Sequence, residues 1–490
     1  MSRAGISPAL EISSPGEHGT SPAVGPSSIK ALDIDVQKRR ICLLICFLAT
    51  LTQGCAGRIW NEPGPVSMLE HARSAADRQS NRADDVFVVL AFSGGGTRSA
   101  AFAYGILETM RDTKLSIKGQ SRRLLDEVDV ITSVSGGSYT AAYYGLFGEK
   151  IFTDFEAAFL KRNVQGELKS LLVNPIALAS LTAPGLNRAD IVATWLGDNV
   201  FQNKSFADMK SWQGPSVIVN ASDINTGMTF SFIQQQFDFL CSNIDDFPVA
   251  RAVMASSAVP GYFAPIALRN FNRDCPARQK AWVLESLKKP DIYSRNYQIA
   301  RGLERYLKPA SMPVVRLVDG GITDNLGVRG SMMSPVMHSG NVDEMVGAFS
   351  PERLDTVTKV LVVVANAQTY EDYTWSREGL EPSLVGAISA SFDSAIGIMN
   401  NETIGLARRG FMQWAENVNK RPARSGRKPV DVTFAALTFD HIQDDDERRH
   451  FNAIPTALSL GNDQVDEVRA LSRRLLGASP EFQSFLTSLR

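Results

Sequence analysis

The stretch Val86-Phe-Val-Val-Leu-Ala-Phe92, followed directly by Ser93-Gly94-Gly95-Gly96-Thr97-Arg98, decides the fold of this chain. Seven consecutive apolar residues are typical of a strand that is buried on both faces of a sheet. The three glycines allow a sharp turn after that strand, and residues 97–110 have the pattern of a helix. A buried strand that leads through a tight turn into a helix is the building unit of an α/β fold.

The same pattern recurs along the chain, where short apolar runs alternate with longer amphipathic stretches. A helix over 137–145 follows the second run. We therefore predict an α/β fold with a largely parallel central sheet flanked by helices. Its strands are expected at residues 86–92, 128–132, 216–220, 314–318 and 360–365, with a late strand at 430–434.

The pattern divides the chain into five regions: 1–37, 38–55, 56–85, 86–370 and 371–490. The first is rich in Ser, Pro, Gly and Ala, and is interpreted as disordered or as a mis-assigned extension. The third is a polar linker, and the fourth holds the alternating strands. The last is mostly helical, over 380–420 and 463–490, and is expected to pack on the fourth. Residues 151–212, helical but broken at Pro175 and Pro184, are predicted to face the core rather than to form a lid.

Composition excludes some classes of function. The chain has 490 residues, 44% of them hydrophobic and 21% charged, and its formal net charge is −1. A charge so close to zero gives no support to nucleic-acid binding, so no nucleic-acid partner is expected. The cysteine spacing fits neither a zinc finger nor an iron–sulfur site.

Region 38–55 has the pattern of a secretory signal. Lys38-Arg39-Arg40 precedes residues 41–51, which are apolar except for Thr50 and too short for the roughly 20 residues of a bilayer span. Cys55 at its end resembles the box of a bacterial lipoprotein, which predicts lipidation there and anchorage in the cell envelope, on the periplasmic side and at the outer membrane. An ordinary cleaved signal, giving a periplasmic or secreted protein, or a short signal anchor are the alternatives. Since signals begin near the first methionine, a start near Val36 is a further hypothesis.

Two cysteines remain beyond this segment. Cys241 and Cys275 can form a disulfide in an oxidising compartment. Two unpaired buried thiols are the competing interpretation.

Ser135 is the best candidate for a nucleophile. A nucleophilic serine projects from a sharp strand-to-helix turn, and small residues two positions before and after it prevent clashes. Ser133 and Gly137 occupy those elbow positions, directly after an apolar strand. Ser133 itself has the bulkier Ile131 before it, and Ser138 would already lie inside the helix.

The glycine-rich loop is the candidate oxyanion hole. Backbone N–H groups aimed at the carbonyl oxygen of an ester stabilise the charge that develops there, and a helix N-terminus adds its dipole. Gly94, Gly95, Gly96, Thr97 and Arg98 supply such donors, with Arg98 bracing the loop or adding positive potential. A phosphate-binding loop would need a Lys-Ser/Thr pair after the glycines, and none follows.

Asp319 is the candidate base. It ends the apolar strand 314–318, and Gly320-Gly321 leave space behind it. Strand ends are where α/β sheets gather ligand groups, and an aspartate held beside Ser135 in a dry pocket can take its proton. A turn-forming Asp-Gly is the alternative if this motif is taken alone. No histidine stands at a predicted strand end, and His338 is the next suspect among His18, His71, His338, His441 and His450.

Together these motifs resemble the patatin-like phospholipase family over about residues 86–370. The resemblance rests on Gly94-Gly95-Gly96-Thr97-Arg98, Ser133-Val-Ser135-Gly-Gly137 and Asp319-Gly320-Gly321, and on segments 223–227, 255–265 and 323–325. It implies a three-layer sandwich, an acylated Ser135, Asp319 as base and orienter, and the glycine loop as oxyanion hole. Ser93 stands where the family usually has an acidic residue, and Ser99 where glycine is common.

The expected function is a serine acyl hydrolase with a Ser-Asp dyad, acting through an acyl-Ser135 intermediate and without a metal or organic cofactor. The resemblance implies that the substrates are lipid esters at a membrane surface: phospholipids, lysophospholipids or glycerides. An acyltransferase with the same dyad is one alternative. A non-catalytic envelope lipoprotein that keeps the fold is the other.

Overall fold

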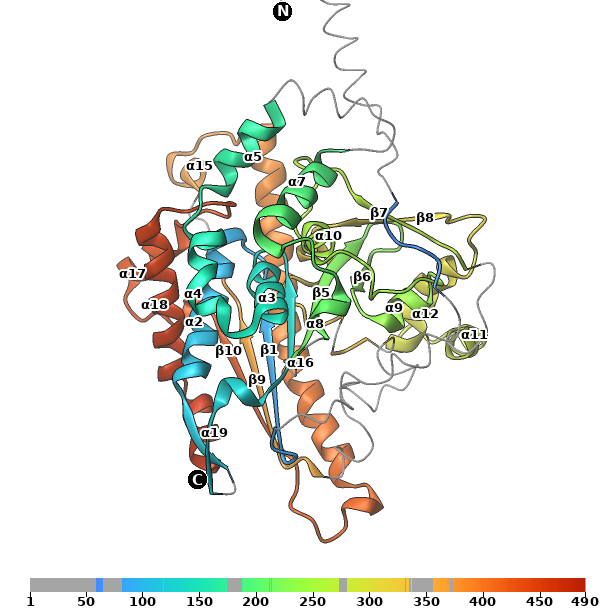
Figure 1. The fold of residues 1–490 in the computed structure, drawn as a ribbon, viewed down its shortest axis with the longest axis vertical. Coiled ribbons are helices and arrows are strands. Elements are labelled where there is room, and N and C mark those ends of the chain that lie inside the picture. The colour runs from blue at the N-terminus through green and yellow to red at the C-terminus, as the bar shows by residue number, and fades with distance from the viewer. Residues whose placement is uncertain are drawn as a thin grey trace, which may run out of the picture. The chain divides into compact units, whose positions relative to one another are not determined.

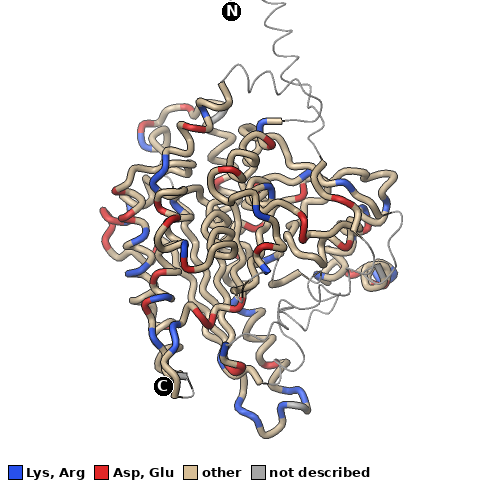
Figure 2. Tube along the Cα trace, in the orientation of Figure 1, with Lys and Arg blue, Asp and Glu red and all other residues tan. Residues whose placement is uncertain are grey.

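The structure is a computed structural model, and it describes residues 59–64, 82–117, 119–173, 187–210, 212, 214–272, 280–330, 332–334, 336, 356–370 and 373–489. All of them belong to one compact unit, Cys55–Arg490. Positive and negative side chains are interspersed over its elements (Figure 2). No helix in the described ranges combines the length and the apolar character that a membrane span requires.

The core of the fold is a mixed sheet in the strand order β10-β9-β1-β4-β5-β8-β7, with β6 paired to β5 (Figure 1). The pairs from β10 to β5 are parallel, whereas β6, β7 and β8 pair antiparallel. A separate hairpin joins β2 and β3. The strands are β1 (Val86–Phe92), β2 (Lys114–Ile117), β3 (Gln120–Arg123), β4 (Val128–Val134), β5 (Ser216–Asp223), β6 (Met228–Ser231), β7 (Ile266–Arg269), β8 (Val314–Val318), β9 (Lys359–Ala365) and β10 (Asp431–Leu437).

The predicted fold class is confirmed: a mostly parallel sheet is flanked by helices, and a helical region follows at the C-terminus. Each strand expected from an apolar run is present at that run. Four strands were not predicted from the sequence: β2, β3, β6 and β7. They have four residues each, which is too few for a periodic pattern to be recognised.

The sheet is the middle of three layers. Val88 and Leu90 of β1 face a core shared with α2, α3 and α18, while Val89 between them faces a second core shared with α16. Successive side chains of a strand point to opposite faces, so a strand covered on both faces must be apolar throughout. This arrangement explains the unbroken apolar runs of β1 and β9.

Helices occupy most of the described residues outside the strands. Helices stand at the two places where one was predicted after a strand, and Pro175 and Pro184 lie outside the described residues. The helices are α2 (Gly96–Asp112), α3 (Gly136–Phe147), α4 (Ile151–Phe155), α5 (Val164–Val173), α7 (Arg188–Leu196), α8 (Phe206–Met209), α9 (Gln234–Asp238), α10 (Val249–Ser256), α11 (Lys280–Lys288), α12 (Arg295–Tyr306), α13 (Gly321–Asp324), α15 (Thr374–Glu378), α16 (Leu384–Asn419), α17 (Asp445–Asn452), α18 (Asn462–Ala478) and α19 (Pro480–Ser488).

The region after residue 370 is built into this architecture. It contributes β10 to the edge of the sheet beside β9, and α18 packs along α2. Arg469 of α18 donates to both carboxylate oxygens of the buried Glu108 of α2, at 2.5 and 2.6 Å. The C-terminal region therefore supports the helix that begins at the glycine loop.

Candidate active site

Ser135 lies at the turn between β4 and α3, where the sequence placed it. Its φ of 47° and ψ of −118° are unusual for a residue other than glycine, and such conformations cost roughly 1–3 kcal/mol. Gly137 permits this turn, because a Cβ atom there would lie 2.7 Å from the Cβ of Phe92. Its N–H instead donates to the carbonyl of Ser93 at 3.1 Å. The small residue at this position thus lets the elbow pack directly on the end of β1.

Ser256, the last residue of α10, holds the turn in place. Its hydroxyl accepts the N–H of Ser135 at 2.7 Å and donates to the carbonyl of Asn220 in β5 at 2.6 Å. Ser138 Oγ lies 3.1 Å from the same hydroxyl. Because the Ser256 proton is used on Asn220, Ser138 is the donor in that pair. Ser256 lies within segment 255–265, which carries part of the family resemblance, but no role could be predicted for it from the sequence.

Asp319 follows β8 and faces Ser135. Ser135 Oγ donates to Asp319 Oδ2 at 2.9 Å, and the N–H of Gly321 donates to Asp319 Oδ1 at 2.8 Å. Both side chains are buried, at 8% exposure each. Burial raises the pKa of Asp319 from 3.8 to about 6, against the lowering effect of the bonds from Gly321 and Ser135. The carboxylate is therefore positioned and tuned to accept a proton near neutral pH.

The histidines of the described residues lie away from this pair. His441 and His450 are exposed; the former accepts the N–H of Thr438, and the latter pairs with Glu467 at 2.8 Å. His18, His71 and His338 are outside the described ranges.

The glycine loop touches Ser135. A Cβ atom at Gly94 would lie 3.3 Å from the Cβ of Ser135 and 2.3 Å from Asn325 Oδ1, so only glycine fits there. Asn325 follows α13, and its carbonyl accepts the N–H of Gly94 at 3.0 Å. The loop, the serine and the aspartate segment thus meet at one end of the sheet. Asn325 lies in segment 323–325, which carries part of the family resemblance, but its contact with the loop was not predicted from the sequence.

The free donors of the loop are fewer than the sequence analysis expected. Gly94 already donates to Asn325, and the N–H of Thr97 donates to the carbonyl of Ala457 at 2.8 Å. The N–H groups of Gly95, Gly96 and Gly136 donate to no described residue. Gly136, the residue directly after Ser135, was not among the predicted donors, although acyl hydrolases commonly use the position after their serine.

Arg98 acts as a brace. Its buried guanidinium donates through Nε to the carbonyl of Ala367 at 2.9 Å, through Nη2 to Thr456 Oγ1 at 3.0 Å and through Nη1 to the carbonyl of Ile454. These partners fix the start of α2 to the segments after β9 and α17. Of the two roles that the sequence left open for Arg98, the bracing role has direct contacts.

Replacement of Gly136 by alanine is expected to lower kcat/KM for ester hydrolysis by about 10²-fold. The new Cβ would lie 2.1 Å from the carbonyl oxygen of Gly96, so the loop must move away from Ser135, and a shift of about 1 Å is enough for that loss. Gly477→Ala is the control, because it meets nothing within 4 Å. Equal activity of the two variants would show that the loop does not need this close contact.

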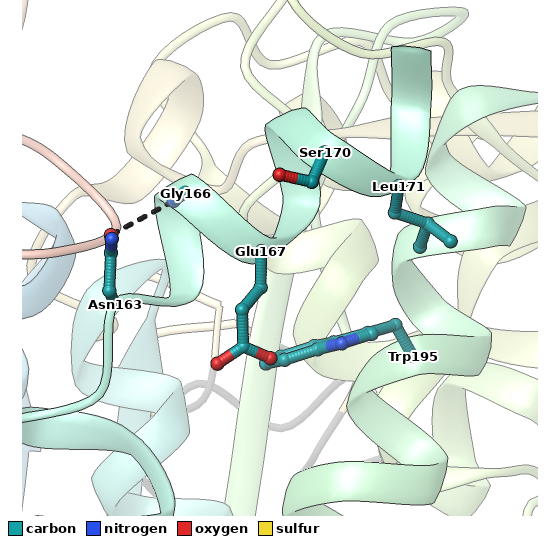
Figure 3. A pocket seen from close by; sticks show the side chains of 6 residues that line it. All are labelled: Asn163, Gly166, Glu167, Ser170, Leu171 and Trp195. Carbon is teal, nitrogen blue, oxygen red and sulfur yellow. Dashed lines mark hydrogen bonds between the residues drawn. The ribbon is translucent and has the colours of Figure 1, made fainter. Parts of the chain in front are cut away.

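A separate open hollow lies between α5 and α7, with a volume of about 600 Å³ (Figure 3). Trp195 and Leu171 form its apolar part, and Asn163, Gly166, Glu167 and Ser170 its polar part. None of these residues contacts Ser135 or Asp319 in the described structure, so the hollow is not part of the candidate active site.

Two sequence predictions remain predictions. Cys241 is disulfide-bonded, but Cys275 lies outside the described residues, so their pairing is open. Cys55 and its signal segment also lie outside them.

The fold and site define an α/β protein with a serine–aspartate pair at the strand ends beneath a glycine loop. Residues 90–331 match the family model of the patatin-like phospholipases, and this part of the chain is a patatin-like phospholipase domain.

Individual relatives are distant. The uncharacterized protein YqhO of Bacillus subtilis (strain 168) is 28% identical over 180 residues, which cover 36% of this chain and 57% of that protein. Among solved structures, human GIVD cytosolic phospholipase A2 aligns with a TM-score of 0.43 and 13% identity, over 87% of this chain and 66% of that one. Its complex with methyl gamma-linolenyl fluorophosphonate aligns with a TM-score of 0.35 and 11% identity, over 86% and 64%. The chain spans less than two thirds of these relatives.

Proposed function

We propose that this protein is a lipid acyl hydrolase that uses Ser135 as nucleophile and Asp319 as base. The observation that carries the proposal is the 2.9 Å hydrogen bond from Ser135 Oγ to Asp319 Oδ2, buried within a patatin-like phospholipase domain. The raised pKa of Asp319 supports it, because a catalytic base works best when its pKa lies near the working pH.

In the first step, Ser135 Oγ attacks the carbonyl carbon of an ester while its proton passes to Asp319 Oδ2. The carbonyl oxygen becomes negatively charged and is stabilised by N–H donors, for which Gly95, Gly96 and Gly136 are available. The C–O bond then breaks, the leaving alcohol takes the proton from Asp319, and acyl-Ser135 remains. Water repeats the sequence with Asp319 as base, which releases the fatty acid and restores Ser135.

The substrates we propose are carboxylic esters of lipids: phospholipids, lysophospholipids or glycerides. The family of the domain supports this class. The Ser135–Asp319 pair is buried, so a substrate must leave water before it reacts. Moving an apolar acyl chain out of water is favourable, and a buried site also excludes water from the base.

The test is turnover by the wild-type protein. It should hydrolyse a short p-nitrophenyl ester and a fluorogenic phospholipid, and a fluorophosphonate probe should label Ser135, as located by peptide mass spectrometry. Added alcohol should leave the fatty acid as the main product. Failure of folded protein to turn over either substrate or to react with the probe would overturn the proposal. An acyl product that depends on the alcohol would identify a transferase instead.

A further inference from the structure

The first half of α16 exposes a row of large apolar side chains. Leu384, Ile388, Phe392 and Ile398 are 78%, 50%, 48% and 68% exposed. At 100° per residue they lie within about one third of the helix circumference, and we call this row the apolar stripe. Asp393 is the single charged residue between 384 and 399, and its position lies on the other side of the helix.

The stripe extends beyond the sheet at its active-site end. Asn419 Oδ1, at the end of α16, accepts the N–H of Val430 just before β10 begins, at 2.7 Å. Asn400 donates to Gln368, three residues after β9 ends. The helix is therefore antiparallel to these strands, and residues 384–399 project past their carboxyl ends by about 24 Å at 1.5 Å per residue. Figure 1 shows α16 reaching beyond the sheet, close to α15.

The candidate active site lies at this same end. α13, which starts two residues after Asp319, packs against α16. Gln368 adjoins Ala367, whose N–H donates to Ser93 Oγ at 3.0 Å and whose carbonyl accepts from Arg98. The end of the stripe near Asn400 is thus linked through residues 367–368 to the glycine loop. Helix α16 is linked through α13 to Asp319.

Two further elements add apolar or aromatic surface here. Tyr262, 72% exposed, and Val259 lie in the loop after α10, where the carbonyl of Ala258 accepts the N–H of Asp319 at 3.0 Å. At the free end of the stripe, the rings of Tyr373 and Trp375 stack at 4.2 Å. Tyrosine and tryptophan favour the boundary between water and lipid.

We propose that the apolar stripe docks the protein on the surface of a lipid bilayer, with the helix lying along the headgroup region and the active-site end beside it. This inference rests on the proposed function, because a lipid ester must leave such a surface to reach Ser135. An uncharged helix face flanked by aromatic rings fits the interfacial region, and it offers no charge to pair with a polar partner.

Binding can be tested without catalysis, in the full chain carrying Ser135→Ala. A Phe392→Trp substitution should add emission, measured as the difference from the Ser135→Ala parent with its six native tryptophans, that shifts to the blue with phosphatidylcholine vesicles and is quenched by lipids brominated on their acyl chains. Tyr293→Trp is the control, because Tyr293 is 91% exposed just before α12 and outside the stripe. No shift at position 392, or a blue-shifted emission already present without vesicles, would overturn the docking surface.

The matching kinetic test uses active protein. Leu384→Ser, Ile388→Ser and Phe392→Ser together should lower phospholipid hydrolysis on vesicles at least tenfold and leave a soluble short ester unchanged. The same exchange at Leu284, Ile292 and Tyr293, also exposed, should change neither rate. Equal vesicle rates in both triple variants, or a dimer that only the stripe variant breaks, would refute lipid docking. If the Phe392→Trp reporter inserts into vesicles but wild-type protein shows no esterase activity, the proposed function is refuted and the docking surface stands.

Discussion

Ser135→Ala is expected to lower kcat/KM for a short p-nitrophenyl ester by at least 10⁴-fold. The substitution removes the atom that forms the acyl intermediate, and what remains is the catalysis that an oxyanion hole provides alone. The side chain of Ser135 makes its hydrogen bond to Asp319, and the backbone bond from its N–H to Ser256 survives the change. The melting temperature should therefore stay within about 3 °C of wild type, which differential scanning calorimetry would measure.

Ser138→Ala is the matched control for this loss. Ser138 lies three residues further along α3, is fully buried and donates to Ser256 rather than to Asp319. Its replacement should leave kcat/KM within tenfold of wild type. A dead Ser138 variant beside an active Ser135 variant would show that the nucleophile had been assigned to the wrong serine.

The strands of the sheet could be predicted because they are covered on both faces. Strands β1 and β9 carry apolar residues at nearly every position, which no amphipathic helix does. The edge strand β7 could not be predicted in this way, since its four residues end in the exposed Arg269. The order of the strands also follows no sequence pattern: β1 has β9 and β4 as neighbours, and β9 comes more than two hundred residues later.

The pairing of Ser135 with Asp319 could be predicted from the sequence, although 184 residues separate them. Each follows an apolar strand directly, and strand ends meet at one edge of such a sheet. The contacts that hold this part of the site in place could not be predicted. Ser256 reaches the N–H of Ser135 from the end of α10, and Ala457 takes the N–H of Thr97 from a loop far downstream. The role of a serine hydroxyl or a backbone carbonyl cannot be predicted from the sequence when it depends only on which distant segments meet in the fold.

The candidate oxyanion donors could not be predicted fully from the sequence for the same reason. Three adjacent glycines predict a loop that can approach a substrate, but they do not tell which N–H groups are already used. Gly94 donates to Asn325, a residue from the other side of the site. Gly136 is among the donors whose N–H no described residue accepts, and the carbonyl oxygen of Gly96 leaves no room for a side chain there.

Asp319→Asn is expected to lower kcat by about 10²- to 10⁴-fold while Ser135 keeps its place. Asparagine has the same shape but cannot take the Ser135 proton, and loss of a general base typically removes two to four orders of magnitude. In the wild type, kcat/KM should rise with pH, with an apparent pKa of about 6, and level off above pH 7, because the base must be ionised. The variant should lose this limb of the profile. If the variant keeps substantial activity and the same rise of kcat/KM with pH, another residue is the base, and His338 would be the first to replace.

The same substitution should make the protein more stable at alkaline pH. Burial raises the pKa of Asp319 from 3.8 to about 6, so the folded state favours the protonated carboxyl. Its contribution to stability is therefore fully present below pH 3.8 and is lost as the pH rises through 6, where the ionised group costs at most about 3 kcal/mol. Asparagine carries no charge at any pH, so urea unfolding should show a free energy of unfolding above that of wild type at pH 8, and a difference that shrinks toward pH 4.5. A variant that is less stable than wild type by the same amount at both pH values would mean that ionisation of the buried carboxyl group does not destabilise the folded state. A gain in stability together with the loss of activity would show that this site keeps an unfavourable buried charge for the sake of its chemistry.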